Sequence, residues 1–229
     1  MSQPEPAPSA APARRPRLHG ADIAAAAAQL FARDGYSNVG MRDVAEALGI
    51  RGASLYHHYT SKEQILYAIA LTVTREPVEQ QLPLLDAPGT PGERLGALVR
   101  AHVRHLCRRR VEHLVGLQEM SLLTPEHRAE IDGHRRYYQR RVREVIAAGA
   151  RAGELHVADP QLAALALLDM LNGISRWYSP GGARPVAELE EEYGELADRM
   201  LDRAQTPWVC GAPPATSMDV SASPPSHCD

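Results

Sequence analysis

The sequence is poor in the residues that build β-sheets and disulfide frameworks. Aromatic residues make up 5% of the chain. No segment alternates valine, isoleucine or threonine with polar residues, which is the pattern of a half-buried strand. The three cysteines, Cys107, Cys210 and Cys228, are too few and too far apart for a disulfide framework or a zinc ribbon. We therefore expect an all-α protein in a reducing cytoplasm.

Long apolar runs are also lacking. The first 17 residues are rich in proline and alanine and have no apolar core of the kind found in signal peptides, which predicts a flexible tail. The most apolar stretch, residues 162–178, is interrupted by Asp169, Asn172 and Arg176 and is too short to span a bilayer. We expect no membrane partner.

Positive charge is not in excess. The formal net charge of the 229 residues is −3, and Lys62 is the single lysine among 25 basic residues. Residues 1–75 nevertheless hold eight basic side chains against six acidic ones, which leaves the remainder acidic. This distribution is compatible with a small DNA-binding head on an acidic carrier.

The most informative stretch runs from Met41 to Lys62. Arg42 to Leu48 and about Ala53 to Tyr59 have the spacing of two short helices, and Gly49 stands between them. Glycine takes the left-handed conformation that ends a helix without steric cost. The pattern predicts a helix-turn-helix, although a glycine between two helices also occurs in ordinary helical hairpins.

In a helix-turn-helix the second helix enters the major groove, where its first residues read bases and later ones contact phosphates. We place Arg51 at the bases, where it can bind guanine with both arms. Tyr56 and His57 are assigned to phosphates, as is Lys62 at the start of the next helix. The predicted DNA-binding residues are Arg42, Arg51, Gly52, Ala53, Ser54, Tyr56, His57, Tyr59 and Lys62.

Three strings in this region resemble the N-terminal domain of the TetR family of transcriptional regulators: LFARDGY (30–36), RDVAEALGI (42–50) and SLYHHYTSKEQIL (54–66). The resemblance is strong over about residues 17–70 and holds in outline beyond. It implies a dimeric regulator, more often a repressor than an activator, that responds to a small effector. Gly40 and Ala53 replace the Thr and Gly common in the family, which affects the operator sequence but not the fold.

Helix signals divide the chain into a tail (1–16), a three-helix helix-turn-helix domain (17–75), a helical effector-binding and dimerisation domain (76–205) and a second tail (206–229). Thr90, Thr124 and Asp159 each precede a proline, a combination that starts helices. We expect helices over about 17–33, 62 to near 77, 90–109, 112–123, 125–149, 160–178 and 185–204. The arginines at 14, 15 and 17 are candidates for minor-groove contacts or belong to a plain solubilising tail.

The helix expected from Leu162 to Tyr178 is apolar nearly all round, so it must be covered on every side. A small DNA-binding head usually works as a pair on two half-sites. We therefore predict a homodimer that binds a palindromic operator, with the last two helices forming a four-helix interface.

Polar residues recur on otherwise apolar helix faces, which suggests either a cavity for a small molecule or hydrogen-bonded core residues. The region from about 122 to 185 is similar to a TetR subgroup whose ligands include acyl-coenzyme A thioesters of fatty-acid or sterol breakdown. This resemblance implies an apolar tunnel with arginines for the phosphates; a different hydrophobic ligand stays open. The predicted effector-binding residues are His102, Leu106, Met120, Arg135, Tyr138, Asn172, Arg176 and Trp177.

Other functions are weighed against the regulator. A metal sensor would use His102, His105, Cys107 and His113, but Cys107 lies opposite His102 on a helix, so we predict no metal and no cofactor. An enzyme would use His102, Glu119 or His134 as acid or base, yet no nucleophile pair or phosphate loop accompanies them, so we predict no catalytic residue. An interaction protein that has lost DNA binding is the third alternative.

Overall fold

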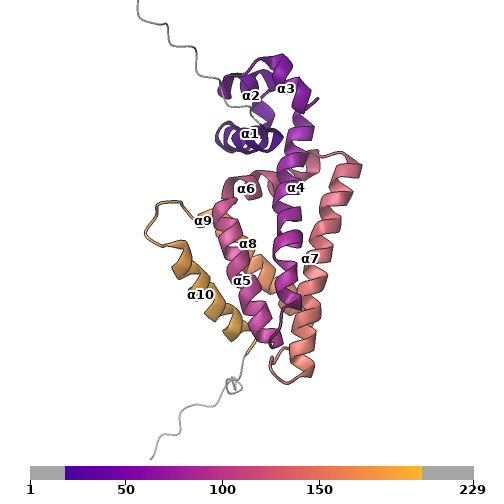
Figure 1. The fold of residues 1–229 in the computed structure, drawn as a ribbon, viewed down its shortest axis with the longest axis vertical. Helices are drawn as coiled ribbons and strands as arrows, with labels where there is room; N and C mark the ends of the chain where they lie inside the picture. The colour runs from indigo at the N-terminus through magenta and orange to yellow at the C-terminus, as the bar shows by residue number, and fades with distance from the viewer. Residues whose placement is uncertain (1–18, 203–229) are drawn as a thin grey trace, which may run out of the picture.

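The computed structural model describes residues 19–202, and within that range the chain is helical without a β-strand (Figure 1). The expected all-α class is therefore confirmed. The predictions made for both tails, including the arginines before residue 18, lie outside the described residues. In the same range no helix combines the length and apolarity that a membrane crossing needs.

The head contains α1 (Gly20–Asp34), the short 3₁₀ helix η1 (Tyr36–Asn38), α2 (Met41–Ala47) and α3 (Gly52–His58). The His19 N–H donates to the Asp22 carboxylate at 2.9 Å where α1 starts, and Gly35, with φ of 85°, follows its last residue. One apolar face of each helix meets in a common core, whose most buried side chains include Ile23, Ala27, Phe31, Val44 and Leu55.

The long helix α4 (Lys62–Gln80) joins the head to the body (Figure 1). Ser61 caps it as predicted, accepting from the Gln64 N–H at 3.2 Å. The helix was expected to end near Pro77 but continues to Gln80. Proline removes one backbone donor, but Pro77 is buried, and the helical pairing resumes with the Gln81 N–H donating to the Pro77 carbonyl at 3.0 Å.

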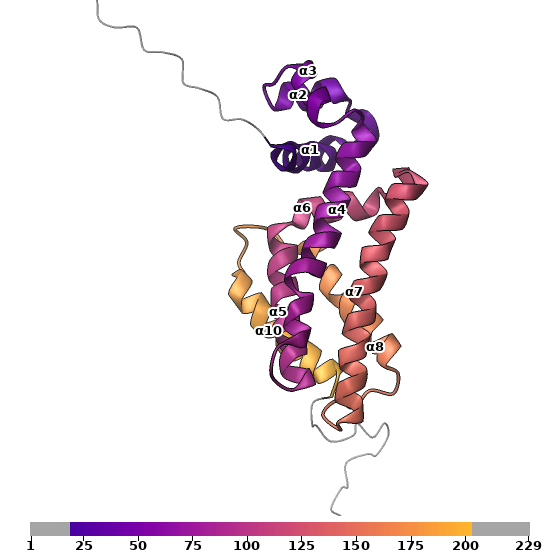
Figure 2. The same ribbon diagram turned by 45° about the vertical axis from the view of Figure 1, so that its right-hand side comes forward.

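The body follows as η2 (Leu82–Asp86), α5 (Pro91–Arg108), α6 (Arg110–Gln118), η3 (Met120–Leu122), α7 (Pro125–Arg151), α8 (Pro160–Asn172), α9 (Ile174–Trp177) and α10 (Val186–Met200). In Figures 1 and 2, α4, α5 and α7 run along the long axis, and α6 crosses between the head and the rest of the body. Helix α10 packs on α5. The rest of the body therefore lies on the side of α6 that faces away from the head.

The predicted helix starts at Thr90, Thr124 and Asp159 are confirmed, since each side chain accepts a backbone N–H of the first turn. The single helix expected over 160–178 was wrong, because the chain breaks between α8 and α9 at Gly173. There the Ser175 hydroxyl donates to the Asn172 carbonyl at 2.9 Å. Such a local bond competes with helical pairing. Likewise the helix expected over 112–123 is α6 followed by η3.

Two apolar cores fill the molecule. The upper core joins the head to parts of the body, because Val115 of α6, Met120 of η3 and Ile131 of α7 pack with head residues. The lower core lies among α5, α7, α8 and α10. Since α4 is continuous through both cores, the domain boundary placed at residues 75 and 76 stays a prediction.

Candidate DNA-binding surface and effector cavity

The helix-turn-helix has the predicted tight turn. Gly49 has a φ of 62°, in the left-handed region, and the Ile50 N–H returns to the Ala45 carbonyl at 3.0 Å. Ala45 is buried where α2 meets α3, and Leu55 is fully buried beneath α3. Small and apolar residues therefore set the crossing, which leaves the opposite face of α3 free for contacts.

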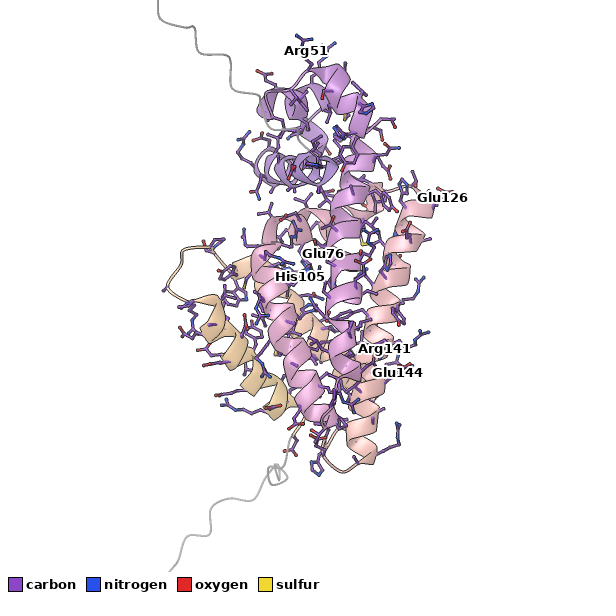
Figure 3. The ribbon with its side chains drawn as sticks, viewed as in Figure 1. Arg51, Glu76, His105, Glu126, Arg141 and Glu144 are labelled. Atoms are coloured by element: carbon purple, nitrogen blue, oxygen red, sulfur yellow. The ribbon has the colours of Figure 1, made fainter. Side chains whose placement is uncertain are left out.

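That free face forms one end of the molecule, where Arg51 is labelled in Figure 3. Tyr56 is 52% exposed, the largest hydrophobic side chain that α3 presents to solvent. Seven of the nine predicted DNA-binding residues are exposed: Arg42 on α2, and Arg51, Gly52, Ala53, Ser54, Tyr56 and His57 at the start of α3 and along it. Their contacts with DNA stay predictions.

Tyr59 and Lys62 point into the protein instead. The Lys62 ammonium donates to the carbonyls of Tyr36 and Val39 at 2.7 and 2.8 Å and lies 4.2 Å from the centre of the Tyr36 ring. The Tyr59 hydroxyl donates to the Gly20 carbonyl at 2.8 Å, and burial raises its pKa. Tyr59, the C-cap residue of α3, thus fastens α1 to the recognition helix, and Lys62 fastens η1 to the start of α4. The DNA contacts predicted for both residues stay predictions.

Two adjoining cavities lie in the body, one between α4, α5, α6, α7 and α8 and the other between α6, α7, α8 and α9. We name the smaller one, with a volume of about 140 Å³, the inner cavity, and the larger one, with a volume of about 510 Å³, the outer cavity. They share wall residues, which are His113, Leu117, Arg135, Asp169 and Asn172. Because α6 contributes to both walls and packs on α1 and α4, the cavities are one helix away from the head.

A hydrogen-bonded network closes one side of the inner cavity. The Tyr138 hydroxyl donates to Gln81 Oε1 at 2.7 Å and lies 2.9 Å from His102 Nδ1. His102 Nε2 is 3.4 Å from Asn172 Oδ1. Burial lowers the pKa of His102 to about 4, so its ring is neutral at pH 7. Burial also raises the pKa of Tyr138.

Two further histidines line the inner cavity. Burial lowers the pKa of both His105 and His113 to about 3, and His113 Nδ1 lies 3.2 Å from the Ser175 hydroxyl oxygen. Sequence reasoning names both only as candidate metal ligands, although the three-residue spacing of His102 and His105 indicates a shared helix face. Among residues 19–202 no cluster of histidine, cysteine and carboxylate side chains is placed to hold a metal.

Two family models match the chain: "Bacterial regulatory proteins, tetR family" over residues 23–69 and "Tetracyclin repressor-like, C-terminal domain" over residues 88–201. A solved regulatory protein of the tetR family from Rhodococcus RHA1 is 34% identical with a TM-score of 0.74, and the match covers 81% of this chain and 98% of that one. The chain belongs to the TetR family of transcriptional regulators.

This TetR-family protein is also similar to two regulators that carry individual names. The HTH-type transcriptional repressor KstR2 from Mycolicibacterium smegmatis is 27% identical over 172 residues, which cover 73% of this chain and 82% of the relative. The structure of AibR in complex with isovaleryl coenzyme A and operator DNA is 28% identical with a TM-score of 0.70, covering 81% of this chain and 99% of that one. The matches span both the head and the body.

The cavities of this TetR-family protein bring together six of the eight predicted effector-binding residues: His102, Leu106, Arg135, Tyr138, Asn172 and Arg176. Met120 and Trp177 are not in their walls. Met120 is buried in the upper core, and its sulfur lies 3.7 Å from an Arg135 nitrogen. Trp177 is 51% exposed and stacks on Tyr193, with ring centres 6.5 Å apart. The position of Trp177 depends on the break at Gly173, and that of Met120 on the core that the head shares with the body.

Sequence reasoning missed the part of the wall that α4 supplies, and on α8 it singled out Asn172 but not the neighbouring wall residues. Val73, Thr74 and Pro77 face the cavity from α4, and Leu165, Leu168 and Asp169 face it from α8. On α4 the apolar residues read as core, and no local signal separates a core face from a cavity wall. Of the residues weighed as acid or base, His102 lies in the wall, whereas Glu119 and His134 do not.

Proposed function

We propose that this TetR-family protein is a homodimeric cytoplasmic repressor that binds a palindromic operator and is released by an acyl-coenzyme A thioester. The observation that carries the proposal is that two adjoining cavities have different walls, one mostly apolar and one with two arginines. The inner part is small and mostly apolar and suits an acyl chain. The outer part contains two arginines and suits the charged coenzyme.

Arg135 and Arg176 are the groups suited to the coenzyme phosphates. Both side chains are exposed and lie in the wall of the outer cavity, which adjoins the inner one. Guanidinium groups bind phosphate oxygens in pairs and keep their charge at every physiological pH. The relative AibR, described with isovaleryl coenzyme A and operator DNA, supports the same ligand class for this chain.

Exposed leucines on α8 and α10 support the homodimer. Leu162 is 63% exposed and Leu165 39% on α8, and Leu196 is 43% exposed on α10. Large apolar side chains that gather on one face of a soluble domain mark an interface. A second copy of the same surface would cover them in a symmetric four-helix contact and would hold two recognition helices about 34–36 Å apart.

The route from cavity to DNA is short. Helix α6 supplies His113 and Leu117 to the cavity wall, and it packs on α1 of the head and on α4, which joins the head to the body. An effector that binds better when α6 and α4 are displaced shifts the dimer towards a conformation that fits the operator poorly. About 1.4 kcal/mol of such coupling lowers operator affinity tenfold.

Calorimetric titration of the purified protein with butyryl-CoA and with free coenzyme A tests the ligand class. We expect the thioester to bind more tightly than free coenzyme A, and the double variant Arg135→Ala/Arg176→Ala to lose at least tenfold in affinity. Arg136→Ala is the matched control, because the neighbouring Arg136 lines neither cavity. Equal binding of thioester and free coenzyme, or no binding of either, would contradict the proposal.

A further inference from the structure

The first two turns of α4 are bound to the start of α7. Oε1 of Glu63 on α4 accepts from the Thr124 backbone N–H at 3.0 Å and lies 2.8 Å from His127 Nδ1. The Tyr67 ring stacks on the His127 ring, with centres 3.8 Å apart and planes 9° from parallel. The Tyr67 hydroxyl donates to Glu130 Oε2 at 2.6 Å. We call these five residues the α4–α7 contact.

The chemistry of the α4–α7 contact holds the two helices in one relative orientation. Glu63, Tyr67 and His127 are half-buried. Burial and the bond to Glu130 raise the pKa of Tyr67 to about 12, so its hydroxyl keeps its proton at pH 7 and donates. Hydrogen bonds to carboxylates are stronger than those between neutral groups, and a stacked pair of rings adds a contact of defined geometry.

The α4 side of this contact moves with the recognition helix. Residues 59–61 are all that separates α3 from α4. The Lys62 ammonium ties the first residue of α4 to η1, and the Ser61 hydroxyl caps the first turn. A displacement of Glu63 and Tyr67 therefore displaces α3 as well.

The α7 side of the contact belongs to the same continuous helix as part of the cavity wall. Helix α7 supplies Arg135, Tyr138 and Gln139 to the inner cavity. Arg135 follows Glu130 by five residues, about 8 Å along the helix axis. Figures 1 and 2 show the start of α7 at the end of the body that faces the head. A ligand that shifts α7 at the cavity therefore shifts the α4–α7 contact.

The crossing of α4 with α6 supplies a pivot for this movement. A Cβ added to Gly116 of α6 would lie 2.9 Å from the Cα of Ala70 on α4, so the two backbones are in close contact there. Glu63 and Tyr67 precede Ala70 and lie between the crossing and α3. A shift of α7 therefore acts on the part of α4 that carries the head.

We propose that Glu63 and Tyr67 are positioning residues that transmit effector binding from α7 to the recognition helix. The proposal rests on the proposed function and deepens it, since it names the contact that links the effector cavity to operator release. Coupling between distant sites is carried by packed side chains, hydrogen bonds and rigid helices, and all three are present here. Without the α4–α7 contact the effector binds, but α3 keeps the orientation that fits the operator.

The test measures operator release and thioester binding separately. Fluorescence polarisation gives the affinity for DNA from upstream of the protein's own gene, with and without saturating butyryl-CoA, and calorimetry gives the affinity for butyryl-CoA. We expect butyryl-CoA to weaken operator binding about tenfold or more in the wild-type protein, but about threefold or less in Glu63→Ala/Tyr67→Ala. The variant should keep its affinity for butyryl-CoA, and its operator affinity without the thioester, within about threefold. A purely structural role would not give this split.

Two further variants and a control locate the effect. His127→Ala breaks the same contact from α7 and should also reduce release, and adding it to Glu63→Ala/Tyr67→Ala should change little, because the three side chains act together. Glu63→Gln/Tyr67→Phe keeps an acceptor oxygen and the stacked ring and should recover part of the response. Glu126→Ala is the matched control and should keep the full response. Figure 3 labels Glu126 at the start of α7, and within the described residues it makes no hydrogen bond or ion pair with α4.

The outcomes separate the two proposals. If butyryl-CoA releases Glu63→Ala/Tyr67→Ala from the operator as fully as the wild-type protein, the positioning role is wrong and the proposed function stands. A tenfold or greater loss of operator affinity without the thioester, or of affinity for butyryl-CoA, would give Glu63 and Tyr67 a structural role instead and overturn the positioning role. If the wild-type protein binds no butyryl-CoA, the proposed function fails and takes the positioning role with it.

Discussion

Arg51 and Tyr56 are both exposed on the free face of the head but have different expected contributions to DNA binding. Arg51, the N-cap residue of α3, is placed at the bases, and Tyr56 at a phosphate. Arg51→Ala should relax base preference at one position by about 1–3 kcal/mol, whereas Tyr56→Ala should weaken binding to all sequences alike. Gel shifts against operator variants measure both. An Arg51→Ala protein with unchanged preference would refute its assignment.

Lys62 shows why some side-chain contacts could not be predicted from the sequence. Residue type and helix position indicated that Lys62 lies near the start of α4, but its ammonium bonds to carbonyls 23 and 26 residues earlier in the chain. A helix pattern cannot show which distant carbonyls need a donor. Arg51 and Tyr56 were easier to place, because exposure on a short amphipathic helix follows directly from the buried position of Leu55.

At the level of elements, the crossing of α4 and α6 is the tightest link between cavity and head. A Cβ added to Gly116 of α6 would lie 2.9 Å from the Cα of Ala70 on α4. Gly116→Ala should therefore force the helices apart and lower the free energy of unfolding by about 1–3 kcal/mol. Urea denaturation measures the change.

The matched control for that crossing is Gly133→Ala. Gly133 lies within α7, and a Cβ there meets nothing within 4 Å. Because alanine favours helices by up to about 1 kcal/mol over glycine, this variant should be neutral or more stable. A Gly116→Ala protein as stable as Gly133→Ala would show that the crossing tolerates a methyl group and that α6 is less tightly coupled to α4.

Helix starts were predictable and helix breaks were not. Thr90, Thr124 and Asp159 carry their caps in the local sequence, so the starts of α5, α7 and α8 follow from it. The continuation past Pro77 and the break at Gly173 depend on burial and on a hydroxyl bond between neighbouring turns. The inner cavity needs five helices at once, so its wall on α4 could not be predicted from periodicity.

At the level of the whole molecule, the three buried neutral histidines make stability depend on pH. The pKa values of His102, His105 and His113 are lowered to about 4, 3 and 3, whereas an unfolded histidine has a pKa of about 6.5. Below pH 6.5 the three histidines bind protons in the unfolded chain but stay neutral in the folded protein. The free energy of unfolding therefore falls as pH falls from about 6.5 towards these folded-state pKa values.

Between pH 6.5 and 5.5 the expected loss is about 1 kcal/mol per histidine. Urea denaturation at fixed protein concentration measures it, and His113→Asn should show a smaller loss than the wild-type protein. A urea midpoint that does not change between pH 7.5 and 5.5 would mean that the three rings take up protons in the folded state.

The proposed dimer also makes a prediction. Leu162→Arg together with Leu196→Arg should place charges in the α8 and α10 interface and give a monomer with weakened operator affinity, as measured by sedimentation and gel shift. Leu122→Arg is the control, because Leu122 is 46% exposed on η3, outside these two helices. If the double variant stays dimeric, the interface lies elsewhere.

The most direct test of the central claim is a fluorescence-polarisation titration of the protein against DNA from upstream of its own gene, with and without butyryl-CoA. The account predicts salt-sensitive binding, with log K falling by about 0.9 per phosphate neutralised for each unit of log salt concentration, and release by a thioester but not by free coenzyme A. Operator binding that no thioester disturbs, although calorimetry finds the thioester bound, would contradict the account.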